Sequence, residues 1–323
     1  MNTNSTSFRS MSLKSKLQFA VLSFGGSAIF FVLFSRGSYY DAFIQAMSVT
    51  NEEFGILFSA YAWVATATYF LGGIVADKFS PRILMFLSFC GTGILNIWFG
   101  LFPSYEVCLF LYIGMGLTTT VTLWAAMLKA TRQFGQNINS ESKAFGFLET
   151  GRGIFGIVVE LFVAFLFNQF VSVVAGLRFV IWTYGFILIL FGIISLFVFD
   201  DSKGSSAISE EKPLQLIWEC IKSPDIWLIT IMAMGGYNIG SCIGSYVGNM
   251  ATSIYGVSIG TAAYLGALIT WLKPVGAFAA AYAGERMGPS KVVMITNIIL
   301  TIISAILIFV TANPNWLYLF LGI

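Results

Sequence analysis

Long apolar runs follow one another along the chain, separated by short polar turns. A helix needs about 20 mostly apolar residues to cross the hydrocarbon core of a bilayer. Nine such runs are present, at residues 17–47, 52–76, 82–102, 105–128, 143–170, 177–199, 225–252, 259–284 and 291–311. Thr50 and Glu53 have the spacing of a capping box that opens the second run. A tenth run begins at Trp316 and the sequence stops at Ile323, so we expect a chain truncated within helix ten.

One longer polar stretch, at residues 200–224, interrupts this series after the sixth run. It divides the chain into a six-helix bundle at residues 1–199 and a partial second bundle at residues 225–323, with helices seven to nine and the start of helix ten. The polar stretch itself is predicted to be a cytoplasmic connector. The predicted fold is therefore an all-α, polytopic membrane bundle of two pseudo-symmetric six-helix halves. Parallel repeats of this kind place a substrate site between the halves, near the bilayer midplane.

Composition supports a membrane protein and excludes several classes of enzyme. Hydrophobic residues make up 57% of the 323 positions and charged residues 10%, whereas a soluble domain carries about 25% charged residues. The absence of histidine removes Ser-His-Asp and Cys-His nucleophiles and histidine-ligated metals. The four cysteines are too scattered for a zinc or redox motif. We expect no enzyme activity, no cofactor and no metal, and the net charge of +2 does not indicate a nucleic-acid partner.

The basic residues lie almost entirely in alternate loops, starting with the N-terminal tail. Lysine and arginine accumulate in cytoplasmic loops of membrane proteins. The alternate loops hold 13 of the 17 basic residues: Arg9, Lys14, Lys16, Lys78, Arg82, Lys129, Arg132, Lys143, Lys203, Lys212, Lys222, Arg286 and Lys291. The opposite loops hold Arg178. The pattern predicts a multi-pass protein of the cytoplasmic (inner) membrane, with the N-terminus in the cytoplasm and the lipid bilayer as its surroundings.

A short motif recurs at corresponding places in the two halves. The loop after helix two reads GIVADKFSPR at residues 73–82, and the loop after helix eight reads AYAGERMGPSK at residues 281–291. In each copy a small residue stands four positions before an acid, a base follows the acid directly, and a proline stands four positions after it. The acids are Asp77 and Glu285. A tight turn with a carboxylate and neighbouring cations is suited to clamping helix ends.

On these residues the chain resembles the major facilitator superfamily, whose loop between helices two and three carries G-x-x-x-D-[RK]-x-G-R-[RK]. The matching positions are Gly73, Asp77, Lys78 and Arg82 in the first half, and Arg286 and Gly288 in the second. The departures are Ser80, Pro81, Ala281 and Glu285. The resemblance implies that Asp77, Lys78, Arg82, Glu285 and Arg286 belong to a gate and do not bind substrate.

Within that superfamily the chain most resembles the organophosphate and organic-anion branch. It is similar to poorly characterised bacterial members that carry an E-T-G-R-G segment in helix five, here at residues 149–153. Glycerol-phosphate transporters of that branch have one arginine in helix one and another in helix seven. Arg36 stands for the first, but Gly240 and Ser241 occupy the place of the second. The two-arginine phosphate site therefore does not carry over intact.

Three cations fall at depths where a membrane helix normally carries none. With a rise of 1.5 Å per residue, Arg36, Arg152 and Lys273 lie roughly 14–18 Å from the nearest predicted helix ends, within a core about 30 Å thick. Each midplane cation costs roughly 2.5–3.5 kcal/mol on insertion scales. A wet cavity and an anionic ligand would offset this cost. We therefore expect the three side chains to bind a carboxylate, phosphate or sulfonate.

Each of these interpretations has a structural alternative. Glu149 and Arg152 are three residues apart on helix five, so they either line a ligand site or form an ion pair that only holds the bundle. Arg36 lies in a cavity if helix one continues to Met47, or reaches the outer interface if the helix ends at Phe34. Asn238 in helix seven is a further candidate to hydrogen-bond the ligand.

The predicted function is secondary active transport of a small organic anion by a monomer that works by alternating access. Exchange against another anion needs only fixed cations, whereas proton symport needs a titratable carboxylate, for which Glu149 and Glu160 are candidates. A sensor that keeps the transporter fold and binds the ligand without moving it is a second class of function.

Overall fold

The computed structural model describes residues 12–137, 141–199, 218–219, 221–266, 275–276, 279, 283 and 286–309. Lys273, Glu285 and the start of the predicted helix ten lie outside these residues.

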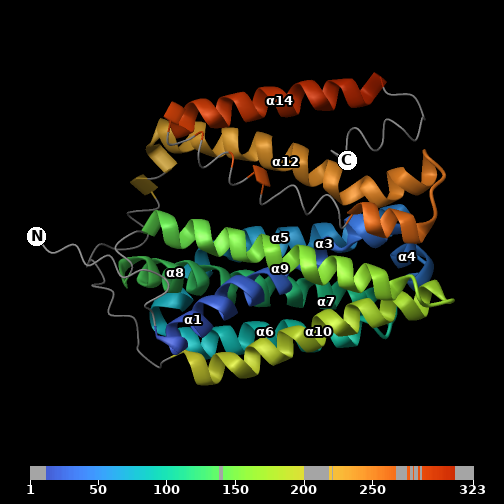
Figure 1. The fold of residues 1–323 in the computed structure, drawn as a ribbon, viewed down its shortest axis with the longest axis horizontal. Coiled ribbons are helices and arrows are strands. Elements are labelled where there is room, and N and C mark those ends of the chain that lie inside the picture. The colour runs from blue at the N-terminus through green and yellow to red at the C-terminus, as the bar shows by residue number, and fades with distance from the viewer. Residues whose placement is uncertain are drawn as a thin grey trace, which may run out of the picture.

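The first half of the chain forms six helices that pack into one bundle (Figure 1). Helix one consists of α1 (Leu13–Ala20), the π-helical η2 (Val21–Gly25), α2 (Gly26–Ala28), α3 (Phe31–Phe34) and α4 (Arg36–Met47). Helices two and three are α5 (Asn51–Lys78) and α6 (Pro81–Phe99). Helix four comprises α7 (Tyr105–Leu117), the π-helical η3 (Thr118–Trp124) and α8 (Ala125–Asn137), and helices five and six are α9 (Glu141–Phe167) and α10 (Val173–Val198).

The lengths and hydropathy of these helices suit a bilayer. Six helices of the described residues are long and apolar enough to cross a membrane, and all six lie in the first half. The second half contributes α12 (Pro224–Ser253) and α14 (Pro289–Phe309), which lie along one side of the first bundle in Figure 1. The all-helical membrane fold is confirmed, with six of the predicted spans in the first half.

Polar residues in the turns define where the helices begin. The Thr50 Oγ1 accepts from the Glu53 N–H at 3.2 Å, while the Glu53 carboxylate accepts from the Thr50 N–H at 2.8 Å, so the predicted capping box is confirmed. Ser80 caps α6, and Pro81 occupies its first turn, where a missing N–H costs no hydrogen bond. The Ser-Pro pair that departs from the family motif is therefore a helix start.

The two ends of the bundle differ in the residues they hold. The basic end holds Leu13, Lys78, Asn137, Val198 and Pro224, where most described lysines and arginines lie. The distal end holds the opposite helix termini, at Met47, Asn51, Phe99, Phe167 and Ser253. The six membrane-spanning helices of the first half and α12 therefore run between these two ends.

Glycines allow the closest helix contacts in the first bundle. A Cβ at Gly93 of α6 would lie 2.8 Å from the carbonyl oxygen of Gly185 in α10, and a Cβ at Gly185 would lie 3.0 Å from that of Gly93. Large apolar side chains such as Trp63 and Phe197 point outward and are 76% and 78% exposed. This distribution, small residues between helices and large apolar ones outside, is that of a lipid-embedded bundle.

The two halves meet at the distal end through α4 and α12. A Cβ at Gly37 would clash with the backbone of Gly244, and one at Gly248 would lie 2.7 Å from the Gly37 carbonyl oxygen. Just beyond this contact, Asp41 accepts hydrogen bonds from the Asn249 amide at 3.1 Å and from the Thr252 hydroxyl. We call Gly37, Asp41, Gly248, Asn249 and Thr252 the distal seal. It joins residues more than 200 positions apart in the sequence.

Substituting Gly93 tests the close contact between α6 and α10. The Gly93→Ala variant should lose about 1–3 kcal/mol of stability, because the added methyl group meets backbone atoms that have no room to move. Thermal unfolding in detergent measures this loss. Gly55→Ala is the matched control, since nothing lies within 4 Å of a Cβ there. Equal melting temperatures for the two variants would contradict the packing described.

Candidate functional site

Helices one and four depart from α-helical geometry beside the same arginine. The π-helical stretches are Val21–Gly25 in helix one and Thr118–Trp124 in helix four. Arg152 reaches both: its Cδ and Nε lie 3.9 Å from where a Cβ of Gly26 would stand, and its guanidinium carbon lies 5.7 Å from the centre of the Trp124 ring. Such insertions are frequent at functional sites, so this junction is the first candidate.

Arg152 is partly paired and partly accessible. Its Nη1 donates to the Glu149 Oε1 at 2.7 Å. The Arg152 side chain is 17% exposed and that of Glu149 is 57% exposed. The Nε atom of Arg152 is buried and has no hydrogen-bond partner. An unsatisfied, charged donor is costly in a low-dielectric environment, so this guanidinium group retains capacity to bind an anion.

Arg36 lies in a box of four aromatic rings. Helix one continues through Arg36 to Met47, and the residue is only 4% exposed. Its guanidinium carbon lies 5.7, 5.2, 4.7 and 5.1 Å from the ring centres of Tyr40, Phe54, Phe58 and Tyr246, respectively. Its Nε and Nη2 have no hydrogen-bond partner.

The four rings offset most of what burial of this charge costs. A midplane arginine costs roughly 2.5–3.5 kcal/mol, and each cation–π contact returns about 0.5–2 kcal/mol. Tyr246 belongs to α12, so Arg36 also joins the two halves next to the distal seal. The box therefore positions Arg36, although two of its donors lack a hydrogen-bond partner.

A chain of aromatic side chains runs between the two arginines. The chain begins at Phe58, which contacts Arg36. The ring centres of Phe58 and Phe34 are 6.0 Å apart, those of Phe34 and Phe30 are 5.9 Å apart, and those of Phe30 and Trp124 are 6.2 Å apart. The ring of Tyr69 lies 6.4 Å from that of Trp124. We call Phe30, Phe34, Phe58, Tyr69 and Trp124 the aromatic face.

The two arginines lie at different depths. Arg152 is level with Gly26, and ten residues separate Gly26 from Arg36, which is about 15 Å along a helix. The structure therefore does not gather Arg36 and Arg152 into one compact cluster. Asn238 is exposed and donates to the carbonyl of Met234 in its own helix at 2.7 Å. Lys273 lies outside the described residues.

The motif residues after helix two lie at the basic end. The Asp77 carboxylate accepts from Lys129 at 2.8 Å, and the same ammonium donates to the Ala76 carbonyl at 3.2 Å. This pair ties helix two to helix four within one bundle. Lys78 is exposed and Arg82 is half-buried.

In the second copy of the motif, Arg286 is exposed, and Glu285 lies outside the described residues. Gly288 has φ of +87°, a conformation that residues with a side chain rarely adopt. The glycine is therefore required by the turn that precedes α14.

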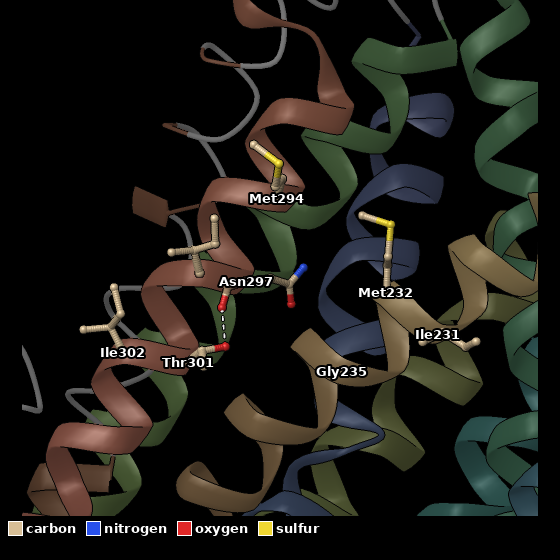
Figure 2. A pocket seen from close by; sticks show the side chains of 8 residues that line it. Ile231, Met232, Gly235, Met294, Asn297, Thr301 and Ile302 are labelled. Carbon is tan, nitrogen blue, oxygen red and sulfur yellow. Dashed lines mark hydrogen bonds between the residues drawn. The ribbon is translucent and has the colours of Figure 1, made fainter.

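A groove of about 390 Å³ separates α12 from α14. Figure 2 shows Asn297 projecting from α14 toward α12. The groove is lined by Ile231, Met232, Gly235, Met294, Asn297, Ile298, Thr301 and Ile302. Its described lining residues carry no charge, and the candidate site remains the face that carries the arginines.

Comparison with known proteins decides the family. Residues 19–323 match the model of the Major Facilitator Superfamily. The chain belongs to this superfamily. It is 27% identical over 314 residues to the inner membrane protein YqcE of Escherichia coli, an alignment that covers 94% of this chain and 73% of YqcE. The family and this relative support a multi-pass protein of the inner membrane.

Two further similarities are more limited. A segment of 111 residues is 28% identical to the probable sulfoacetate transporter SauU of Cupriavidus necator, covering 32% of this chain and 25% of SauU. The crystal structure of a bacterial homologue of the lysosomal transporter Spinster, inward-facing and unoccupied, superposes with a TM-score of 0.64 at 18% identity. That alignment covers 85% of this chain and 62% of the other, so the chain spans less than two thirds of that protein. At this identity the match shows the superfamily fold alone.

Several residues of the site were not singled out by the sequence. Asp41 is an acid within an apolar run, which by itself could have marked it as a candidate. Its partners Asn249 and Thr252 are far away in the chain, so the sequence does not reveal their contact. Phe30 and Phe34 are four residues apart, the spacing that places two side chains on one helix face. In a chain with 32 phenylalanines, a pair at this spacing does not by itself indicate a binding site.

Removing the Asp41 carboxylate should open the distal seal. In a background without native cysteines, Ser245→Cys reports whether α4 and α12 separate. Asp41→Ala should raise the rate of maleimide labelling of that cysteine at least roughly tenfold, because two hydrogen bonds to a charged group, about 1.5–3 kcal/mol each, are lost. Glu52→Ala, an exposed acid at the same end, is the control. Unchanged labelling in the Asp41 variant would show that the seal does not depend on this residue.

Proposed function

We propose that this protein carries a small organic anion across the membrane by alternating access of its two bundles. The observation that carries the proposal is Arg152, a cation within a membrane-spanning helix whose Nε has no partner and whose side chain is partly accessible. Ionisable residues within membrane spans mark substrate pathways in many transporters. A carboxylate, phosphate or sulfonate would satisfy the unpaired donor, because a guanidinium group binds such oxygens through two parallel hydrogen bonds.

The similarity to a probable sulfoacetate transporter supports this class of cargo, since sulfoacetate is an organic anion. Arg36, Glu149, Asn238 and Lys273 complete the set of residues that we propose to act on the substrate. Arg36 keeps the distal part of the site positive, and Glu149 holds the Arg152 guanidinium in place while the site is empty.

The contacts between the halves support a conformation that is closed at the distal end. α12 packs tightly on α4 from Gly244 to Thr252. Toward the basic end, the α12 residues Ile229, Met234 and Tyr237 are 67%, 58% and 68% exposed. Because the basic end is predicted to face the cytoplasm, we propose that this conformation admits substrate from the cytoplasm. Transport then requires the distal seal to part while the basic ends approach.

At the basic end, we propose that the two motif loops act as the opposing gate. Their residues are Asp77, Lys78, Arg82, Glu285 and Arg286. The pair of Asp77 with Lys129 supports this role, because it makes the ends of helices two and four move as one unit.

The Glu149–Arg152 pair also supports proton-coupled transport as an alternative. While ionised, Glu149 occupies the Nη1 donor that an anionic substrate would use. Protonation of the carboxyl group would break the ion pair and free Arg152 for the substrate. One proton and one anion would then enter the site together.

Uptake by the complete gene product in proteoliposomes tests the anion role of Arg152. Arg152→Gln should lower uptake of a labelled alkyl or aryl sulfonate about 10- to 100-fold, since charged hydrogen bonds contribute roughly 1.5–3 kcal/mol. Lys222→Gln, which removes an exposed cation at the basic end, should transport like the unsubstituted protein. Full uptake by the Arg152 variant would contradict the proposal.

A pH gradient across the vesicles separates the two coupling schemes. Anion exchange should proceed at the same rate with and without the gradient, and Glu149→Gln and Glu160→Gln should leave it unchanged. Proton symport should instead accelerate several-fold with an inward proton gradient and lose that acceleration in Glu149→Gln. Gradient-independent exchange in all three proteins would rule out the proton scheme.

A further inference from the structure

Beside Arg152, the aromatic face presents partly accessible rings. Phe34 is 41% exposed and Tyr69 is 49% exposed, while Phe30, Phe58 and Trp124 are half-buried. Each ring contacts the next, from Trp124 at Arg152 to Phe58 at Arg36. A site built for a small hydrophilic anion would surround its cation with hydroxyl and amide groups. The aromatic face instead offers a continuous apolar surface formed by successive rings.

This face is turned toward the second half. Phe58 of α5 and Tyr246 of α12 lie against the same guanidinium group, that of Arg36. Farther toward the basic end, the phenol group of Tyr237 of α12 lies near those of Tyr61 and Tyr69 of α5. Tyr69 in turn contacts Trp124. The rings therefore line the region between the bundles, where a transported molecule has to pass.

Packing between helices does not account for this arrangement. Aromatic residues that only hold helices together are buried, as Phe43 and Phe99 are in the core of the same bundle. Phe34 is instead 41% exposed between the buried residues Leu33 and Ser35, and Tyr69 is 49% exposed. Exposed apolar surface next to an unsatisfied cation is complementary to a molecule with one charged end and one apolar end.

We infer that the substrate is an amphipathic anion whose charged group binds Arg152 and whose apolar, preferably aromatic, body lies along Trp124, Phe30 and Phe34 toward Phe58. This inference rests on the proposed function and names its substrate class. The rings favour stacked or edge-on contact with a flat apolar body. Each additional ring of the ligand covers a further side chain of the face, so affinity should increase with the length of the apolar body at constant charge.

A series of sulfonates with one charge and increasing apolar size tests the inference on the unsubstituted protein. Methanesulfonate, benzenesulfonate and naphthalene-2-sulfonate are titrated calorimetrically against the complete gene product in nanodiscs, with empty nanodiscs as the blank. Naphthalene-2-sulfonate should bind at least tenfold more tightly than methanesulfonate. Equal or weaker binding of the aromatic members would overturn the inference and leave the proposed anion transport standing.

Two variants separate the contribution of the aromatic face from that of the charge. Phe34→Ser should abolish the advantage of naphthalene-2-sulfonate and leave methanesulfonate binding unchanged. Phe110→Ser, which removes a phenylalanine that is 62% exposed elsewhere on helix four, should keep that advantage. Unchanged preference in Phe34→Ser would also overturn the inference.

A neutral ligand distinguishes failure of the inference from failure of the proposed function. 2-Naphthalenemethanol has the same rings without the sulfonate, and it should bind at least tenfold more weakly than naphthalene-2-sulfonate. Equal binding of the alcohol, together with unchanged binding of the sulfonate by Arg152→Gln, would overturn both the anion site and the amphipathic substrate.

Discussion

A positive charge inside a membrane bundle requires partners that replace the water it has lost, and this requirement organises the site. Arg36 is surrounded by four rings, one of them from the second half, and its Nε and Nη2 lack hydrogen-bond partners. Arg152 has one carboxylate partner and an unsatisfied Nε. The same residue type therefore serves two purposes in one bundle. Arg36 fixes a junction between the halves, and Arg152 retains the capacity to bind an anion.

Close backbone contact is the second constraint, and it sets where the halves meet. Without side chains at Gly37 and Gly248, α4 and α12 approach until carbonyl oxygens limit the distance. Such a contact holds few side chains in place, so the helices can separate without repacking a core. The specific hydrogen bonds are concentrated on Asp41. The interface combines closely spaced backbones, the hydrogen bonds of Asp41 and the contact of Arg36 with Tyr246, all of which must part when it opens.

Much of the scaffold follows from local sequence, but the site depends on contacts between distant residues. Apolar run lengths predicted the first six helices, and Thr50 with Glu53 predicted the start of α5. The π-helical stretches were not predictable, because a shift of hydrogen-bond register depends on what packs against the helix. Helix periodicity placed Glu149 beside Arg152, as observed. It did not reveal the aromatic face, since ring contacts between helices one, two and four depend on side-chain rotamers.

The most direct test is the position of a bound anion in an experimental structure of the complete gene product. 6-Bromonaphthalene-2-sulfonate carries a heavy atom that anomalous diffraction locates without ambiguity. We expect the sulfonate within hydrogen-bond distance of the Arg152 guanidinium group and the bromine near Phe34. An anion bound elsewhere, with Arg152 turned toward the lipid, would contradict the proposed site. The helical scaffold would remain, but its proposed cargo would not.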